Sequence, residues 1–236
     1  MVKKKNKENF LKKNYQLSFR YIRESRNFIY AVIGVFIFSS LIGFFVPAPA
    51  YVAEQISKFI EELLRQTQDM SVFELIRFIF INNFKSSLSG MALGVFLGIF
   101  PMISIIANGY ILGFVVLASV NSDGILVLWR LFPHGIFELP AVFISLGMGL
   151  RIGLPFIYRY FSYYSKKENV LALISGVLFL VPAIIFTLIF NNDLRKHQLK
   201  NFSYRFKSSL KVFVLIVIPL LIVAAIIEGS LIVFMG

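Results

Sequence analysis

Long apolar runs alternate with charged stretches along this chain. About 20 apolar residues are enough for a helix to cross the hydrocarbon core of a bilayer, which is ~30 Å thick. Five runs approach or exceed this length: residues 28–46, 88–120, 134–150, 170–190 and 212–227. His134 and Glu138 are the acid and base side chains that lie inside one of these runs. The pattern therefore predicts an all-α fold, a polytopic bundle of transmembrane helices.

Residues 51–83 show a different pattern. Their apolar side chains recur at helical spacing with charged residues between them: Ile56, Phe59, Ile60, Leu63 and Leu64. This spacing is typical of an amphipathic helix. Ser71, followed three residues later by Glu74, predicts a capping box that opens another helix. We expect an external amphipathic helical loop at residues 51–80 of a single transmembrane domain, residues 28–236, preceded by a basic segment at residues 1–27.

The run at residues 88–120 would be about 50 Å long as one helix, which exceeds one ordinary crossing. Pro101 divides it, so we expect two short helices, about 84–100 and 102–119, with a break near this proline. Glycines at every fourth position predict close approach of neighbouring helices: Gly90, Gly94 and Gly98, then Gly109 and Gly113.

The charge is concentrated at the amino terminus. The chain has 24 Lys and Arg against 12 Asp and Glu, a net charge of +12, and many of the bases precede residue 28. We expect a protein of the plasma membrane. Because cytoplasmic segments of membrane proteins carry an excess of Lys and Arg, we expect its amino terminus to lie in the cytoplasm. There the basic residues would contact anionic lipids and not nucleic acid. The chain has no cysteine, which excludes disulfides and thiol chemistry.

Two loops, residues 151–169 and 191–211, are both basic and are separated by one apolar segment. If that segment, residues 170–190, is a re-entrant hairpin bent at Pro182, both loops lie inside and the chain crosses five times. If it crosses fully, the chain has six spans and one basic loop lies outside, against the charge rule. The charge rule favours five spans, and six remain the alternative.

A small set of polar residues lies within or at the ends of the spans, where ionisable groups are costly unless they face protein or water. His134 and Glu138 are one helical turn apart, which is compatible with a hydrogen bond that caps the helix after Pro133. They also suit a proton or ion relay, or a metal site completed by Glu228. The whole predicted polar cluster is His134, Glu138, Glu228, Asn108, Asn82 and Asn83.

Several motifs resemble the stage II sporulation protein M family. They are Asn82-Asn83, Asn108-Gly109 with Gly113, the string Pro133-His134-Gly135-Ile136-Phe137-Glu138-Leu139-Pro140-Ala141, Gly149-Leu150-Arg151, and Ala224-Ala225-Ile226-Ile227-Glu228-Gly229. The resemblance implies a multi-span membrane protein. In sporulating bacteria such proteins scaffold cell-wall hydrolases during engulfment, and relatives also occur in organisms that do not sporulate, archaea included. The chain departs from the family in a longer region at 165–211 and in lacking Thr-Pro after Glu228-Gly229.

Three functions remain open. The first is a membrane scaffold or assembly component, forming homo-oligomers or binding other membrane or surface proteins. The second is a small-solute or ion permease, or a permease subunit, that uses the His/Glu cluster. The third is a metal-dependent intramembrane hydrolase, with His134, Glu138 and Glu228 as metal candidates. We expect a protein that is not an enzyme and needs no cofactor, because Glu61-Glu62-Leu63-Leu64-Arg65 is one residue short of a Glu-Glu-x3-Arg protease signature.

Overall fold

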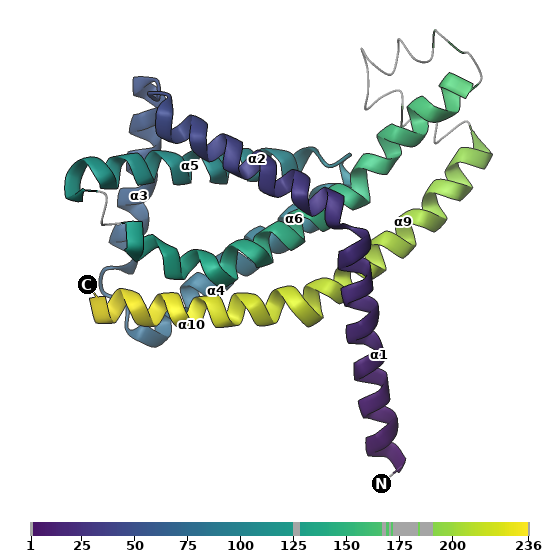
Figure 1. The fold of residues 1–236 in the computed structure, drawn as a ribbon, viewed down its shortest axis with the longest axis horizontal. Helices are drawn as coiled ribbons and strands as arrows, with labels where there is room; N and C mark the ends of the chain where they lie inside the picture. The colour runs from purple at the N-terminus through teal and green to yellow at the C-terminus, as the bar shows by residue number, and fades with distance from the viewer. Residues whose placement is uncertain are drawn as a thin grey trace.

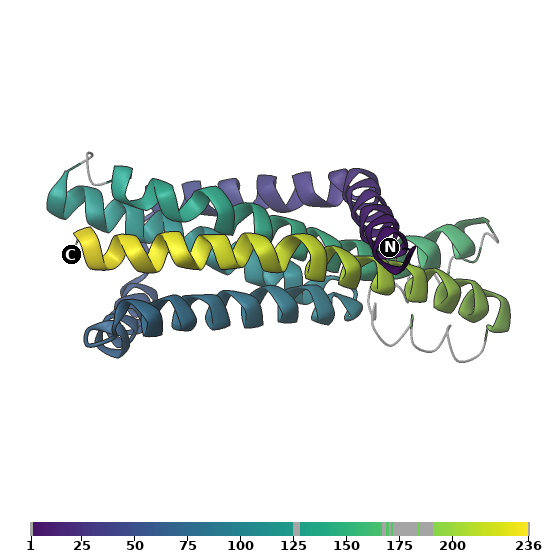
Figure 2. The ribbon, with the colours of Figure 1, turned by 90° about the horizontal axis from the view of Figure 1, so that it is seen from below.

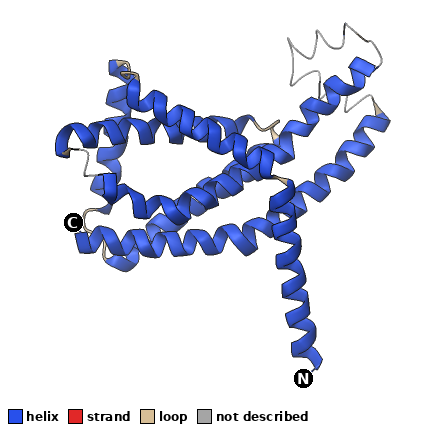
Figure 3. Cartoon of the chain, viewed as in Figure 1, coloured by secondary structure: helices blue, strands red, loops and turns tan. Residues whose placement is uncertain are grey.

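The computed structural model describes residues 2–124, 128–166 and 191–235, with residues 169, 171 and 184 between them. Every regular element in this part of the chain is a helix (Figure 3). This confirms the predicted all-α class. The apolar segment at residues 170–190, predicted to be re-entrant, lies almost entirely outside the described residues.

Five helices run along the length of a bundle. Helices α2 (Arg26–Phe45), α5 (Ile99–Asp123) and α10 (Ile218–Met235) run in one direction, and α4 (Val72–Ala92) and α6 (Leu128–Lys166) run in the other (Figures 1 and 2). Four stretches are long and apolar enough to cross a membrane: Arg26–Phe45, Ile99–Ser122, Gly135–Lys166 and Leu199–Ile232.

Three further helices lie at the two ends of this bundle. Helix α1 (Val2–Glu24) leaves one end at a steep angle, and α3 (Ala50–Thr67) lies across the opposite end (Figure 1). Beyond the end where α1 leaves, α9 (Asn192–Val212) runs beside the distal part of α6. The rings of Phe156 on α6 and Phe202 on α9 are 6.0 Å apart and help to join these two helices.

Helix α4 begins where the sequence predicts a helix start. Ser71 and Glu74 form the expected capping box: the Ser71 backbone N–H donates to Glu74 Oε2 over 2.9 Å, and the Glu74 N–H donates to Ser71 Oγ. The helix then continues unbroken to Ala92, with Leu75 and Ile79 buried against Ala225 of α10. Residues 72–80, the last part of the predicted external helical loop, are the first turns of α4.

The break expected near Pro101 lies earlier in the chain. After a short 3₁₀ turn, Leu93–Val95, the backbone reverses at Leu97 and Gly98, whose φ angles are 57° and 75°. Pro101 lies in the first turn of α5, where the N–H that proline lacks would have no helical partner. The predicted pair of helices with a break close to Pro101 is confirmed, but the left-handed pair, and not the proline, turns the chain.

Two other helices are longer than their apolar runs predict. Helix α6 begins before Pro133 and continues through Arg151 to Lys166, so the predicted loop at 151–169 is largely helical.

Near the start of α10, residues Phe213–Val217 form a π-helical turn just before Pro219. Such a turn widens the helix next to a residue that cannot donate to the preceding turn.

Glycine allows the closest helix contacts. A Cβ added at Gly109 of α5 would lie 2.6 Å from the Phe36 carbonyl oxygen of α2, and one added at Gly149 of α6 would lie 2.6 Å from the Gly90 carbonyl oxygen of α4. Real Cβ atoms do not approach backbone oxygens so closely. The pairs α2–α5 and α4–α6 therefore depend on backbone-to-backbone packing, as small-residue interfaces in membranes do.

Candidate functional site

The two predicted intramembrane carboxylates lie on neighbouring antiparallel helices. Glu138 is on α6 and Glu228 is on α10, and both side chains are half-buried. Ala141, one turn after Glu138, is buried in the same cluster as Leu221 of α10. Both carboxylates therefore lie in the half of the bundle nearest α3, opposite the end from which α1 leaves.

His134 belongs to the same helix as Glu138, but its side chain lies outside the described side chains. The predicted His134–Glu138 pair, and any metal site that uses the His134 imidazole, therefore also lie outside the described side chains. Among the side chains that are described, no three His, Cys, Asp or Glu residues gather as a metal-binding group.

The asparagines of the predicted cluster occupy different surroundings. Asn108 lies on an exposed face of α5, and its amide donates to the Ser104 carbonyl oxygen of its own helix over 2.8 Å. On α4, Asn82 is exposed and Asn83 is half-buried. The amide of Asn108 is thus satisfied within one helix, while Asn82 borders a cavity at the α3 end of the bundle.

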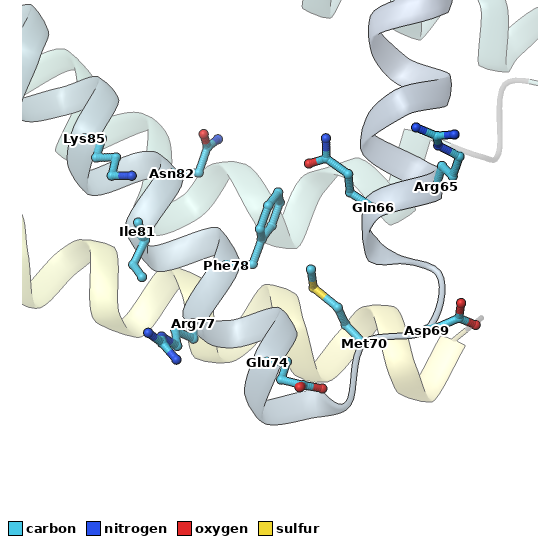
Figure 4. Close-up of a pocket in the computed structure, with 10 residues that line it drawn as sticks. All are labelled: Arg65, Gln66, Asp69, Met70, Glu74, Arg77, Phe78, Ile81, Asn82 and Lys85. Atoms are coloured by element: carbon cyan, nitrogen blue, oxygen red, sulfur yellow. The ribbon is translucent and has the colours of Figure 1, made fainter.

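That cavity has a volume of about 560 Å³ and lies between the end of α3 and the first turns of α4 (Figure 4). Met70 and Phe78 lie between the two helices (Figure 4). Its polar rim carries three bases, two acids and two amides: Arg65, Arg77, Lys85, Asp69, Glu74, Gln66 and Asn82. The cavity is therefore a mixed-charge recess at the surface.

Helix α3, whose last turn borders this cavity, exposes three large apolar side chains. Its buried residue is Ile56, whereas Tyr51, Phe59 and Leu64 are 72%, 54% and 63% exposed. On its charged face, Lys58 and Glu54 form an ion pair of 2.6 Å. The helix is amphipathic, as predicted: Ile56 is buried and Ile60 and Leu63 are half-buried on one face, while Tyr51, Phe59 and Leu64 remain exposed.

A polar junction that sequence reasoning missed lies at the opposite end of the bundle. Arg151 of α6 donates through Nη1 to the Tyr21 carbonyl oxygen over 3.0 Å and to the Ser25 hydroxyl, and through Nη2 to Glu24 Oε2 over 3.1 Å. Its guanidinium carbon also lies 3.9 Å from the centre of the Tyr21 ring. One arginine therefore ties the end of α1 and the start of α2 to α6.

Helix α9 completes the junction. The Tyr21 hydroxyl donates to the Arg205 carbonyl oxygen over 3.1 Å, and Arg205, 7% exposed, donates through Nη1 to the Arg151 carbonyl oxygen over 3.3 Å. Burial raises the pKa of the Tyr21 hydroxyl, and the hydrogen bond from Arg151 lowers the pKa of the Glu24 carboxyl. Tyr21 therefore stays protonated and Glu24 ionised near neutral pH.

Two signals in the sequence could have pointed to this junction. Arg151 follows directly on an uncharged stretch in Gly149-Leu150-Arg151, a place where an arginine needs acceptors. Ser18 and Tyr21 share one face of a helix that is otherwise largely exposed and basic, and Ser25 directly follows that helix. Neither signal identifies the partner, because the groups that meet are 54 to 184 residues apart.

The fold and the apolar helix surfaces define an all-helical integral membrane protein. A sequence model of the family described as "Stage II sporulation protein M" matches residues 32–231, most of the chain. The chain belongs to the stage II sporulation protein M family, in agreement with the motifs noted in the sequence.

A curated relative is an uncharacterised protein of Methanocaldococcus jannaschii. It is 31% identical to this chain over 111 residues, which are 43% of this chain and 50% of the archaeal protein. The aligned part of the chain thus spans half the length of this relative. No solved structure matches the chain.

Proposed function

We propose that the protein is a membrane scaffold that binds partner proteins through helix α3 and the recess beside it. The observation that carries this proposal is the exposure of Tyr51, Phe59 and Leu64 on a helix held across the end of the bundle. An exposed apolar patch rimmed by charged groups is typical of a surface that contacts another protein or a membrane. Family membership is consistent with a scaffold role.

The proposal includes a five-span topology in the plasma membrane. Helices α2, α4, α5, α6 and α10 would cross, with α1 and the α6–α9 extension in the cytoplasm and α3 outside. This arrangement is supported by α9 lying beside the distal part of α6 and by the basic residues of α1 and α9 at one end of the bundle. Basic segments favour the cytoplasmic side.

Site-specific photo-crosslinking in native membranes tests the scaffold. A photo-reactive residue at Phe59, on the exposed apolar face, should crosslink to protein, either another membrane or surface protein or a second copy of this chain. The matched control is Glu61, which is exposed on the opposite side of the same helix and should give far fewer protein adducts. If Phe59 crosslinked only to lipid, α3 would be an interfacial helix and the scaffold proposal would fail.

A second function, an ion or small-solute permease, is favoured by one observation. Glu138 and Glu228 are half-buried on adjacent helices within apolar stretches, where carboxylates often mark transport paths. Under this alternative Glu138→Gln abolishes flux into proteoliposomes while the folded protein is retained. Under the scaffold proposal the same variant keeps its Phe59 crosslinks, and neither protein shows flux above empty liposomes.

A further inference from the structure

A second recess lies between α1 and α9, at the end of the bundle where α2 begins. Its volume is about 430 Å³. Leu17, Tyr21 and Tyr204 give it an apolar wall. Its polar lining consists of Ser18, Arg20, Glu24, Lys207, Ser208 and Lys211. The recess therefore combines basic and hydroxyl groups with an aromatic wall.

The recess has an excess of positive charge that the surrounding structure does not neutralise. Glu24, its acidic member, is already bound by Arg20 and by Arg151, each over 3.1 Å. Lys207 and Lys211 are one helical turn apart on α9, and neither forms an ion pair with a residue in the described ranges. Two ammonium groups on one wall thus have no counter-charge of their own.

Ser18 supplies the second, independent observation. The residue is 2% exposed, and its hydroxyl is buried without a hydrogen-bond partner in the described structure. A buried hydroxyl without a partner loses its hydration and gains nothing in return. Because Ser18 lines the recess, an acceptor oxygen bound there would satisfy it.

We propose that this recess binds the phosphate group of an anionic glycerophospholipid. Phosphate offers several acceptor oxygens and a negative charge, which match two lysines and the hydroxyls of Ser18 and Ser208. The source is a lipid because the recess adjoins the start of the apolar stretch Arg26–Phe45, and Lys211 directly precedes an apolar run. These positions set the recess at headgroup depth, where basic residues attract anionic lipid.

The bound lipid has a structural consequence. Its headgroup would contact α1 on one side and α9 on the other, so it would join the amino-terminal helix to the bundle beside the Arg151 junction. This inference does not depend on the scaffold proposal, because it concerns the other end of the bundle.

Native mass spectrometry of the purified full-length chain tests the proposal. The chain in detergent is titrated with phosphatidylglycerol, phosphatidylcholine of the same acyl chains, or inorganic phosphate. One phosphatidylglycerol should bind per chain, roughly tenfold more tightly than phosphatidylcholine. Neutralising both lysines in a Lys207→Gln, Lys211→Gln variant should weaken that binding by roughly tenfold or more.

Two further variants make the result specific. Lys12→Gln with Lys13→Gln removes the same charge from exposed positions of α1 outside the recess, and should leave the affinity unchanged. Ser18→Ala removes only a hydroxyl and leaves the helix packing in place, so it should fold normally and bind several-fold more weakly. Equal binding of the two lipids, or equal loss in the Lys12/Lys13 control, would overturn the proposal. So would displacement of the lipid by millimolar inorganic phosphate, which would assign the recess to a free anion.

Discussion

At the scale of single residues, Arg151 joins several helices, and no sequence motif predicted these contacts. It donates to Tyr21, Ser25 and Glu24 and lies over the Tyr21 ring, and its side chain is 14% exposed. Replacing Arg151 removes the charge-assisted hydrogen bonds that join the helices, although the Tyr21 carbonyl oxygen still accepts from Ser25 and Glu24 is still bound by Arg20. The residue therefore fixes the angle at which α1 leaves the bundle.

We predict that Arg151→Gln lowers the free energy of unfolding by about 1–3 kcal/mol, because charge-assisted hydrogen bonds from α6 to the Tyr21 carbonyl oxygen and Glu24 are lost. Arg151→Lys should recover only part of this, since an ammonium group cannot reproduce the guanidinium fork. Denaturant unfolding in detergent micelles measures both. Arg23→Gln, at an exposed position of α1, is the control and should be neutral. Equal stability of the Arg151 and Arg23 variants would contradict the assigned role.

A pH dependence follows from Glu24. Its pKa in the folded chain is lowered by Arg151, so its ionised form stabilises the fold above the ordinary carboxyl pKa of 4.5. This stabilisation is lost as the pH falls from that value through the lower folded pKa. The effect is small, because the side chain is 38% exposed and solvent screens the pair. Protection factors of α1 amides, which are corrected for the intrinsic pH dependence of hydrogen exchange, should fall over this range in the native chain and stay flat in Glu24→Gln.

At the scale of the elements, the α2–α5 pair depends on glycine. A Cβ at Gly113 would overlap the Ser40 carbonyl oxygen and lie 2.8 Å from the Phe44 nitrogen. We predict that Gly113→Ala lowers the free energy of unfolding by about 1–3 kcal/mol through overpacking. The matched control is Gly34→Ala on α2, where nothing lies within 4 Å of the added Cβ. That change should be neutral or stabilise by up to about 1 kcal/mol, because alanine is the better helix former. Thermal unfolding in detergent compares the two.

The elements also mark how far sequence reasoning reaches. Apolar periodicity and the Ser71–Glu74 spacing are local, and they predicted the helical class and the start of α4 correctly. The break near Pro101 was placed a few residues too late because the left-handed backbone at Leu97 packs against Phe156 and Tyr160, a tertiary contact that no local pattern reveals. The length of α6 was missed because the stretch at 151–169 was assigned to a loop from its basic composition.

The candidate sites, like the helices, divide into features that local sequence reveals and features that only tertiary contacts create. The polar residues inside apolar runs were easy to select, and the structure places Glu138 and Glu228 on adjacent helices. The Arg151 junction was missed because hydrogen bonds between residues more than 120 positions apart leave no trace in local spacing. Unlike the glycine ladder, a single arginine does not repeat, so periodicity cannot signal its partner.

At the scale of the whole molecule, the five-span topology makes a sharp prediction. The chain has no native cysteine, so single cysteines can report sidedness without a background signal. A membrane-impermeant maleimide applied to intact cells should label Gln68→Cys at the end of α3. It should label neither Lys166→Cys nor Lys200→Cys until the membrane is permeabilised.

These two lysine positions flank the apolar segment at residues 170–190. If that segment crossed the membrane, Lys166 and Lys200 would lie on opposite sides, and one of them would react in intact cells. Labelling of one lysine position without the other would therefore establish six spans. Protection of both in intact cells is the expected outcome.

The position of α1 has a consequence for how the protein is made. The groups that hold Tyr21 in place, the Arg205 carbonyl oxygen and the Ser209 hydroxyl, follow it in sequence by 184 and 188 residues. Helix α1 therefore cannot dock on α9 until α9 has been made, long after α1 itself. Until then α1 is held only from the side of α6, through Arg151, and a chain terminated before α9 would display α1 as a more loosely held basic arm that quality-control proteases can reach.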